Sequence, residues 1–298
     1  MHLLLIFNPH AGGGKAAKKV DLVTGLLKSK GIEFELVLTK YKSHAIEIAA
    51  AADLNLYDGI VAAGGDGTFF EVLNGYFRNP LKKEIPLGIL PVGTGNSLSH
   101  DIIVQKEELT NFIDLISKGN SKCIDIIHVK NDRGEFWYAN TMGLGFVTDV
   151  NITGNRLKVI GKMAYTLGVL FHTLRLKTYP VKLIAEKTNL ELNNVFISFS
   201  NSRYTGGNYF LAPKAIIDDG LLDLIIVNKL SRIQLLQTFP KIFSGKHIET
   251  RFVECLKFSS VRVETGDKLP LSPDGEIFGN TPAIISCLPK AVRVFSDL

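Results

Sequence analysis

The feature that most constrains this fold is a pattern that occurs three times in the first hundred residues: an apolar run, a glycine-containing loop and a helix-like segment. The three loops are Asn8–Gly14, Gly64–Thr68 and Pro91–Asn96. A continuous apolar run is typical of a strand buried on both faces, and strands that alternate with helices form a parallel sheet. We therefore expect a doubly wound α/β domain that binds ligands at the carboxyl ends of its strands.

Strands and helices are expected to alternate through the first third of the chain. The apolar runs predict strands at residues 3–7, 34–39, 60–63 and 87–90, and the apolar periodicity predicts helices at 15–29, 45–52, 69–77 and from about residue 97. The resulting order is β-α-β-α-β-α-β. It indicates one domain over residues 1–125.

The pattern changes after residue 125 and favours a second, β-rich domain over residues 126–298. Turn signals such as Asp218-Asp219-Gly220 and Pro273-Asp274-Gly275 separate short strand-like segments. Strands are expected at 124–129, 136–140, 181–186, 195–200, 222–227, 258–264 and 291–295, and helices at 161–177 and 231–243, the second with Ser231 as its N-cap. The last segment could return to the first domain.

Composition supports two folded domains and leaves the partner open. Of the 298 residues, 46% are hydrophobic and 21% are charged, so enough apolar surface is available for full cores. The net charge of +5 is mild. It fits an anionic membrane surface, a nucleotide or a nucleic acid, and does not choose among them.

Cysteine usage and apolar runs indicate the compartment. Cys123, Cys255 and Cys287 are far apart in the sequence, which argues against a disulfide framework and for a reducing, cytoplasmic compartment. The first apolar run stops at Asn8, so we expect a strand and not a signal peptide. The uncharged apolar stretch 163–174 is shorter than the roughly 20 residues that span a bilayer. We expect a protein that contacts membranes only peripherally.

The three glycine loops predict an anion site. Backbone amides freed in such loops, with the helix N-termini that follow, bind phosphate groups. A single loop of this kind is usually only a turn, whereas three in succession favour a phosphate-binding cleft. The Walker A pattern fails because Lys15 is followed by Ala16, and the sequence contains neither a GxGxxG fingerprint nor the protein-kinase signatures. The seven histidines are scattered, without the spacing of a metal site.

Five stretches of the chain together resemble one superfamily, the diacylglycerol-kinase-like lipid kinases, which includes bacterial diacylglycerol kinases and the sphingosine and ceramide kinases. The stretches are NPHAGGGK (8–15), GGDGTFFEVLNGY (64–76), PVGTGNSLSHDI (91–102), GGNYFLAPKAIIDDGLLDLIIV (206–227) and PDGEIFG (273–279). The GGDGT motif alone is shared with NAD kinases. The five motifs in this order are much more specific, and they extend over nearly the whole chain.

The resemblance implies a fold and an activity. The α/β domain would bind the nucleotide, a sandwich-like β domain would bind the lipid, and the active site would lie in the cleft between them. The protein would be an ATP- and Mg²⁺-dependent kinase of lipid metabolism and phospholipid biosynthesis that phosphorylates a lipid hydroxyl, most simply that of diacylglycerol. By the same resemblance, ATP would be held by Asn8, Gly12, Thr39, Gly65, Asp66, Gly67, Thr68, Glu71, Thr94 and Asn96.

The resemblance also implies roles for several carboxylates. Asp66 would act near the phosphates and Mg²⁺, and Glu276, at the start of a strand-like segment, would take the proton from the lipid hydroxyl. Asp219, counted with the catalytic residues, would bind a structural Mg²⁺ together with backbone carbonyls near Ile216 and Leu221, and Asp125 would belong to a supporting acidic network. These roles fit the chemistry, because phosphoryl transfer needs charge neutralisation, hard oxygen ligands for Mg²⁺ and a general base.

Each of these carboxylates also has a plain structural alternative. Asp66 could be a turn residue, Asp219 a solvated turn, Glu276 a hairpin residue and Asp125 a structural acid satisfied within an apolar strand. In isolation the structural reading is the better one for Glu276. The five motifs taken together favour the functional reading.

One position departs from the family pattern. Many members read GTGND, whereas this chain has Ser97 after Gly93-Thr94-Gly95-Asn96. Asp101 follows four residues later and would lie on the same helix face as Ser97, so we expect it to substitute in the acidic network. Sphingosine-kinase-like members also lack the acid, which blurs the lipid class.

The segment 155–179 is the candidate wall of a lipid entrance. It carries Arg156, Lys158, Lys162, Arg175 and Lys177 around an apolar centre with Val169, Leu170 and Phe171. Packing of that centre on the sheet is the simpler interpretation, and an interfacial element is the sharper one.

Several functions stay open beside a diacylglycerol kinase. A sphingoid-base kinase is permitted by Ser97, and an NAD kinase is disfavoured by the stretches 206–227 and 273–279. A catalytically silent lipid- or nucleotide-binding protein is disfavoured by Asp66, Asp219 and Glu276, while Ser97 keeps it open. The expected partners are ATP, a lipid, an anionic membrane surface and a second copy in a homodimer, with no nucleic acid.

Overall fold

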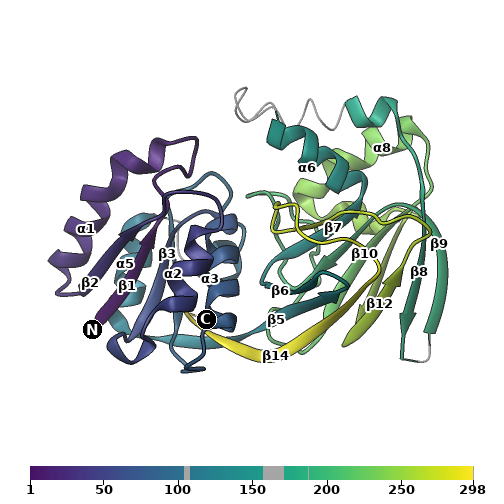
Figure 1. Ribbon diagram of the computed structural model, residues 1–298. Coiled ribbons are helices and arrows are strands. Elements are labelled where there is room, and N and C mark those ends of the chain that lie inside the picture. The colour runs from purple at the N-terminus through teal and green to yellow at the C-terminus, as the bar shows by residue number, and fades with distance from the viewer. Residues whose placement is uncertain (104–107, 157–170, 187, 298) are drawn as a thin grey trace. The chain divides into compact units, whose positions relative to one another are not determined.

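The computed structural model describes residues 1–103, 108–156, 171–186 and 188–297. The chain forms two compact units, which we call unit 1 (Met1–Ile126 and Lys290–Leu298) and unit 2 (Ile127–Pro289). The chain passes from one unit to the other twice, within strands β5 (Ser121–Asn131) and β14 (Ala283–Phe295). Figure 1 shows the elements of each unit. Within the described residues, no helix is long and apolar enough to cross a membrane.

Unit 1 is built on a parallel sheet, as the alternating pattern predicted. Its strands are β1 (His2–Phe7), β2 (Glu33–Leu38), β3 (Gly59–Gly64) and β4 (Leu87–Pro91). They lie in the order β2-β1-β3-β4, and the end of β14 pairs in parallel with β4 through Val294 and Leu87. Nearly all residues of β1, β3 and β4 are buried. The chain adds β2 on one side of β1 and β3 on the other, so the direction in which strands are added reverses between β1 and β3. In doubly wound sheets this switch point marks the place where ligands bind.

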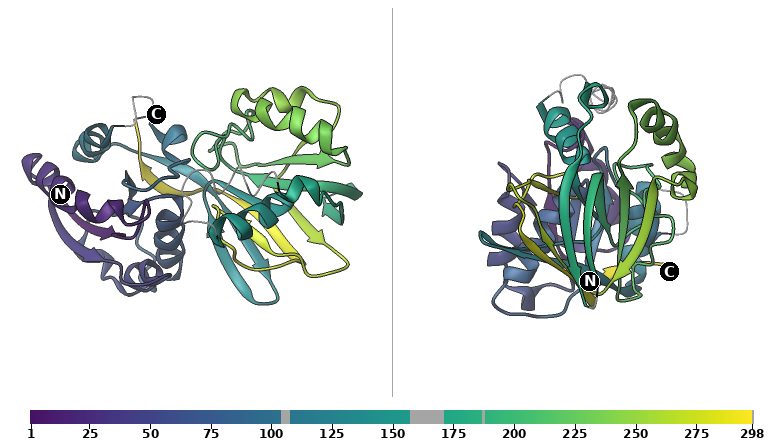
Figure 2. Two further views of the ribbon diagram at one scale, coloured as in Figure 1. Left: turned by 90° about the horizontal axis from the view of Figure 1, so that it is seen from above. Right: turned by 90° about the vertical axis from the view of Figure 1, so that its right-hand side faces the viewer.

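Helices cover both faces of this sheet. The longer ones are α1 (Val20–Ser29), α2 (His44–Ala51), α3 (Asp66–Arg78) and α5 (Leu109–Lys118). Helix α2 packs against α3, and α1 packs against α5. The views in Figures 1 and 2 show the two pairs on opposite sides of the strands. The doubly wound α/β expectation for the first domain is therefore confirmed.

The structure differs from the expected helices of unit 1 in three places. The segment 15–29 begins as a 3-10 helix, η1 (Lys15–Lys19), and becomes α-helical only at Val20. The helix expected from residue 97 is a single turn, α4 (Ser99–Ile102), because Asn96 and Ser97 belong to the preceding loop. Sequence reasoning missed α5, although its buried Phe112, Ile113, Leu115 and Ile116 have helical spacing. A second 3-10 turn, η2 (Leu54–Leu56), precedes β3.

Unit 2 is mainly β, as predicted. Its further strands are β6 (Gly134–Tyr138), β7 (Thr141–Gly145), β8 (Tyr179–Ala185), β9 (Thr188–Ser200), β10 (Leu222–Asn228), β11 (Val253–Phe258), β12 (Ser260–Glu264) and β13 (Leu271–Pro273). The main order is β11-β10-β9-β8-β12-β14, with antiparallel neighbours, and β7 pairs with both β9 and β13. The strands β7, β11 and β13 and the first half of β14 were not predicted.

Two helical segments of unit 2 pack over the sheet. Helix α6 (Phe146–Arg156) was not predicted. Helix α8 (Arg232–Thr238) begins at the predicted N-cap, where the Ser231 hydroxyl accepts a hydrogen bond from Gln234 N and the Gln234 side chain accepts one from Ser231 N. The segment expected to be helical to residue 243 continues as 3-10 helix η4 (Phe239–Ser244), because Pro240 cannot donate the amide that an α-helix needs. A further 3-10 turn, η5 (Lys246–Glu249), follows.

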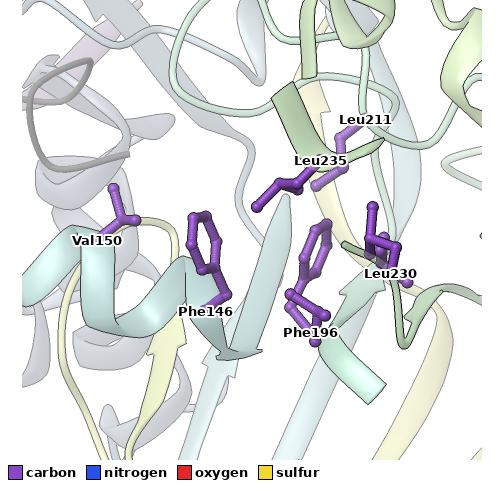
Figure 3. Packing of buried hydrophobic residues seen from close by; sticks show 8 residues of the cluster. Phe146, Val150, Phe196, Leu211, Leu230 and Leu235 are labelled. Atoms are coloured by element: carbon purple, nitrogen blue, oxygen red, sulfur yellow. The ribbon is translucent and has the colours of Figure 1, made fainter. Parts of the chain in front are cut away.

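A buried apolar cluster joins these helices to the strands. Phe146 of α6, Phe196 of β9 and Leu235 of α8 gather around the same space in Figure 3. The other buried members are Val150, Val195, Leu211, Val227 and Leu230. Most of the helix expected at 161–177 lies outside the described residues, as do Lys158, Lys162, Val169 and Leu170; residues 171–174 are helical.

Candidate functional site

The three glycine loops converge at the carboxyl edge of the unit 1 sheet. The amide of Asn8 donates to Ala63 O at 2.9 Å, which joins the end of β1 to the end of β3. The amides of Val92 and Gly93 donate to Gly64 O at 3.1 and 2.9 Å, which joins the end of β3 to the loop after β4. The expectation that these loops lie along one edge is confirmed.

The side chain of Asn8 holds the first two loops together. Its oxygen accepts a hydrogen bond from His10 N at 3.0 Å, and its amide nitrogen donates to the Thr68 hydroxyl at 3.1 Å. Gly12, in the same loop, has a positive φ of 61°, and a Cβ there would lie 3.8 Å from the Thr94 hydroxyl. The structure thus brings residues from the first loop beside residues from the second and the third.

The second and third loops touch backbone to backbone. A Cβ added at Gly93 would lie 2.7 Å from Gly65 N, and one added at Gly65 would lie 2.8 Å from Gly95 O. Those distances are shorter than side chains tolerate, and backbone atoms cannot swing away as a flexible side chain can. Glycine is therefore required at both positions for the two loops to meet.

Asp66 connects the same two loops through its side chain. It is the first residue of α3, with Gly67 and Thr68 in the same turn. Its carboxylate accepts hydrogen bonds from Ser97 N at 3.0 Å and Leu98 N at 3.4 Å, and its own amide donates to Gly95 O at 3.0 Å. The carboxylate is thereby held at the N-terminal end of α3, where a negative charge is electrostatically favoured. Sequence reasoning did not foresee the amide contacts at Ser97 and Leu98.

Asn96 contributes an acceptor to this cluster of loops. Its side-chain oxygen is buried and has no hydrogen-bond partner among the described residues. Its backbone oxygen accepts a hydrogen bond from Ser99 N at 3.2 Å and so starts helix α4. A buried acceptor of this kind is costly unless a ligand, an ion or water supplies the missing partner. The loop cluster therefore carries one feature that calls for a bound group.

Glu71 and Thr39 lie at the same edge of the sheet but face other partners. The Glu71 carboxylate accepts hydrogen bonds from Ser43 N at 2.8 Å and Ala45 N at 3.3 Å. It thus caps the start of α2, where Ser43 makes no side-chain cap of its own. Thr39 is buried at the end of β2, and its amide donates to Phe7 O at 2.8 Å. Their expected contacts with ATP stay predictions.

The predicted acidic network involves Asp125 and Asp101, which both belong to unit 1. Asp125 is fully buried in β5, and its carboxylate accepts a hydrogen bond from Lys290 N at 2.7 Å, so it ties β5 to the returning strand β14. Asp101 is buried in α4. Helix α4 begins at Ser99, and Ser97 lies in the turn before it, where its carbonyl accepts a hydrogen bond from His100 N at 3.3 Å. A role for Asp101 in place of the family's acid stays a prediction.

In unit 2, Glu276 follows a tight turn that is anchored on β7. Asp274 and Gly275 have φ values of 46° and 80°, and Glu276 N closes the turn by donating to Pro273 O at 2.8 Å. The Asp274 carboxylate accepts hydrogen bonds from the amides of Asn140 and Thr141, both at 3.2 Å. Glu276 was expected to open a strand, and this expectation was wrong: the residue lies in a bend of the irregular segment 276–279. The turn fixes the backbone from which its carboxylate projects.

Asp219, the expected metal ligand, is already engaged within unit 2. Its Oδ1 accepts a hydrogen bond from Leu221 N at 3.0 Å, and its Oδ2 lies 2.8 Å from the Lys257 ammonium. Lys257 also lies 3.2 Å from the buried carboxylate of Asp223, its direct cross-strand neighbour on β10. Sequence reasoning missed Lys257 because β11 was not recognised. Had it been, the pairing of Asp223 with Lys257 would have followed from the register.

The charges at Asp219, Asp223 and Lys257 support one another. Burial raises the pKa of Asp223, and Lys257 partly opposes that rise. Burial tends to lower the pKa of Lys257, but its hydrogen bond to Asp219 and the charge of Asp223 leave that pKa raised. The ammonium is therefore charged at neutral pH. The described residues contain no group of three or more His, Cys, Asp or Glu placed for a metal ion. With Lys257 seated on both carboxylates, these residues do not fit a resident Mg²⁺ held by Asp219 and the carbonyls of Ile216 and Leu221.

A cavity of about 230 Å³ lies in unit 2 beside α6. It is lined by Phe146, Asp149, Phe171, His172, Arg175, Lys177 and Tyr179. The Asp149 carboxylate accepts a hydrogen bond from the Tyr179 hydroxyl at 2.5 Å and pairs with Lys177 at 3.3 Å. Burial and the Asp149 contact raise the pKa of Tyr179, so its hydroxyl stays a neutral donor. The cavity combines aromatic walls with paired charges and is smaller than most whole-ligand pockets.

Comparisons with known proteins agree over the full length of the chain. Residues 2–129 match the family described as diacylglycerol kinase catalytic domain, and residues 140–296 match the YegS C-terminal NAD kinase beta sandwich-like domain. A diacylglycerol kinase of Mycobacterium tuberculosis is 31% identical, over 96% of this chain and 92% of the relative. Sphingosine kinase 1 of Arabidopsis thaliana is 25% identical, over 99% of this chain and 72% of the relative.

A solved structure has the same fold. The crystal structure of a "putative diacylglycerol kinase" from Bacillus anthracis str. Sterne aligns with a TM-score of 0.81 at 27% identity, covering 99% of this chain and 97% of that one. The agreement spans both units, so the sandwich-like assignment of the second domain is confirmed together with the α/β assignment of the first.

The pairing of Lys257 predicts how unit 2 responds to divalent cations. In the absence of nucleotide, Mg²⁺ should leave the thermal midpoint of the wild type unchanged, because Lys257 occupies the two carboxylates. Lys257→Met should lower the free energy of unfolding by about 2 kcal/mol, since it leaves the buried Asp223 unpaired. Added Mg²⁺ should then restore part of that loss by binding only the folded state.

The matched control for this experiment is Lys268→Met, which removes a lysine paired with an exposed carboxylate, Asp132. It should change stability little and create no response to Mg²⁺. Differential scanning calorimetry across a Mg²⁺ series measures all three proteins. A wild-type midpoint that rises with Mg²⁺, and a Lys257→Met midpoint that does not, would contradict this account of Asp219.

Proposed function

Because this chain belongs to the lipid kinase family that carries a diacylglycerol kinase catalytic domain, we propose that it transfers the γ-phosphoryl group of ATP to the free hydroxyl of diacylglycerol. The observation that carries the proposal is the convergence of the three glycine loops at the carboxyl edge of the unit 1 sheet, with the buried, unpartnered oxygen of Asn96 among them. Phosphate-binding loops at this edge are what a nucleotide-dependent transferase of this fold requires.

In this proposal the nucleotide loops bind and orient the triphosphate. The N-terminus of α3 offers the positive end of a helix dipole to phosphate oxygens. The Asn8 side chain and the Gly65–Gly93 contact fix the loops before the nucleotide arrives, so little ordering remains to oppose binding. Such preorganisation suits phosphoryl transfer, where positioning and electrostatics supply most of the catalysis.

The same loops contain donors that fit a nucleotide-bound Mg²⁺. Asp66 supplies a carboxylate and Asn96 a buried oxygen without a partner, and Mg²⁺ in kinase sites commonly takes one or two protein oxygens beside the phosphates. When bound, the ion would neutralise charge on the transferred phosphoryl group. Asp66 would hold its carboxylate in place through the amides of Ser97 and Leu98.

Glu276 is proposed as the general base. A carboxylate that accepts the proton of the lipid hydroxyl would allow the oxygen to attack phosphorus as the bond to ADP breaks. The turn of Asp274 and Gly275 is held by two backbone amides, which gives Glu276 a fixed starting point. The cavity beside Phe146 and Tyr179 is proposed to receive part of the lipid.

Diacylglycerol is favoured over a sphingoid base by the relatives. The diacylglycerol kinase of Mycobacterium tuberculosis is 31% identical and matches over 92% of its length, whereas the sphingosine kinase of Arabidopsis thaliana is 25% identical and matches over 72%. Ser97, where many family members have an acid, keeps the sphingoid base as the second candidate. NAD and a catalytically silent role are the remaining alternatives.

A lipid panel tests the substrate. The purified full chain should transfer label from γ-labelled ATP to diacylglycerol dispersed in detergent micelles, with turnover at least tenfold above that on sphingosine, ceramide or NAD. Transfer to sphingosine above diacylglycerol would replace the proposed substrate. Absence of transfer to every acceptor, by a folded protein that binds ATP, would favour the silent alternative.

Asp66→Asn should lower kcat by a factor of about 10² or more, because the carboxylate charge near the phosphates is lost. One oxygen remains to accept an amide, but the new amide nitrogen would face Ser97 N or Leu98 N, so we also expect a loss of stability of roughly 1 kcal/mol. Turnover assays beside chemical denaturation separate the two effects. A variant with normal kcat would remove Asp66 from the catalytic group.

Glu276→Gln should lower kcat by about 10²- to 10⁴-fold, because glutamine keeps the size of the side chain and cannot accept the proton. Affinity for ATP should change less than about threefold, since the proposed ATP contacts belong to unit 1. Calorimetric titration with ATP beside lipid turnover measures both quantities. Full activity would place the base elsewhere, and loss of ATP binding would assign Glu276 to the nucleotide site.

A further inference from the structure

Helix α8 and the 3-10 helix η4 expose large apolar side chains to solvent. Ile233, Leu236 and Phe243 are 69%, 45% and 56% exposed, while Leu235 and Thr238 of the same segment are buried on the unit 2 core. Exposed apolar residues scattered singly are ordinary on protein surfaces. Three on one short segment, which we call the apolar patch, are of the kind that marks a binding surface.

Basic residues are concentrated in the same stretch of the chain. The stretch 229–251 contains five basic side chains, all exposed, against the single acid Glu249: Lys229, Arg232, Lys241, Lys246 and Arg251. Within the described part of the chain none of the five takes part in a salt bridge. Other cations of unit 2, such as Lys177, Lys257 and Lys268, are paired with carboxylates. Charge is therefore left uncompensated in this stretch.

A second segment of unit 2 also exposes apolar and basic side chains. Phe171 and Leu174 are 45% and 69% exposed, and Arg175 beside them is exposed as well. Leu176 of this segment and Phe239 of η4 pack against the same buried cluster, so both segments cover one core. Figures 1 and 2 (right) show α6 and α8 at the same end of the unit 2 strands.

We propose that the exposed face of α8 and η4, with the basic residues of the same stretch, docks this protein on an anionic lipid surface. Apolar side chains with cations around them suit insertion at the boundary between acyl chains and headgroups, where cations meet lipid phosphates. A two-fold contact between two copies through this face would instead bring the same five unpaired cations together, which is unfavourable. The proposal rests on the proposed lipid kinase function, which requires access to lipid, but it is tested without turnover.

The apolar part is tested by vesicle flotation of the full chain without ATP. The wild type should bind vesicles that contain phosphatidylglycerol more tightly than pure phosphatidylcholine vesicles. Ile233→Gln with Phe243→Gln should weaken binding to the anionic vesicles by about tenfold or more, because two apolar side chains lose their buried surface. The matched control is Leu22→Gln with Leu56→Gln, which changes two side chains of unit 1 that are 54% and 61% exposed, and it should bind like the wild type.

The basic part is tested by a charge-matched pair of variants. Arg232→Gln with Lys241→Gln should weaken binding to the anionic vesicles about 25-fold and reduce its dependence on salt, since each cation near such a surface changes partitioning roughly fivefold. Lys18→Gln with Lys28→Gln removes the same charge from exposed lysines of unit 1 and should have little effect.

Two outcomes would overturn the proposal. One is vesicle binding by the Ile233, Phe243 double variant that equals the wild type. The other is a wild-type dimer in analytical ultracentrifugation that this variant dissociates while vesicle binding persists. Turnover of diacylglycerol in detergent micelles, measured in parallel, separates this proposal from the kinase: the docking variants should keep it, and its absence in the wild type would refute the proposed function while leaving the flotation result intact.

Discussion

The contact between the backbones of Gly65 and Gly93 is the constraint on which the candidate site depends. A Cβ at either position would push the second glycine loop away from the third. The hydrogen bonds of the Asp66 carboxylate to Ser97 N and Leu98 N, and the position of the Asn96 oxygen, all require the two loops to meet. Glycine loses more conformational entropy on folding than any other residue. Here that loss is offset by a contact between the two loops that a residue with a Cβ would not permit.

The sequence allowed the architecture of unit 1 to be predicted because its signals are local. Buried parallel strands read as apolar runs, and a loop must follow each one, so the convergence of Asn8, Gly64 and Pro91 at one edge followed from the order of elements alone. Helix boundaries were less accurate. The chain around Ser97 looked helical, but its amide is taken by Asp66, a residue 31 positions earlier, and no local pattern reports such a contact.

In unit 2 the prediction failed where pairing partners are distant in sequence. Strand β14 was recognised only over its last residues, since Pro289 and the positive φ of Lys290 interrupt its alternation of buried and exposed side chains. Missing β11 hid Lys257, and with it the reason why Asp219 is an ion-pair partner in this structure. A motif can identify a carboxylate, but only the strand register identifies the group that lies against it.

The chain's second crossing between the units bears on the order in which the protein can be built. Unit 1 consists of residues 1–126 and 290–298. All of unit 2 is therefore synthesised before the end of β14, which pairs with β4, exists. The carboxylate of Asp125 in β5 receives its hydrogen bond only when Lys290 has been synthesised. The carbonyl of Asn120 likewise gains its partner only when Ser296 has been added. On the ribosome, unit 2 is therefore complete while the unit with the glycine loops still lacks the strand beside β4. Loss of the last ten residues would remove that strand from the first unit and leave most of the second in place.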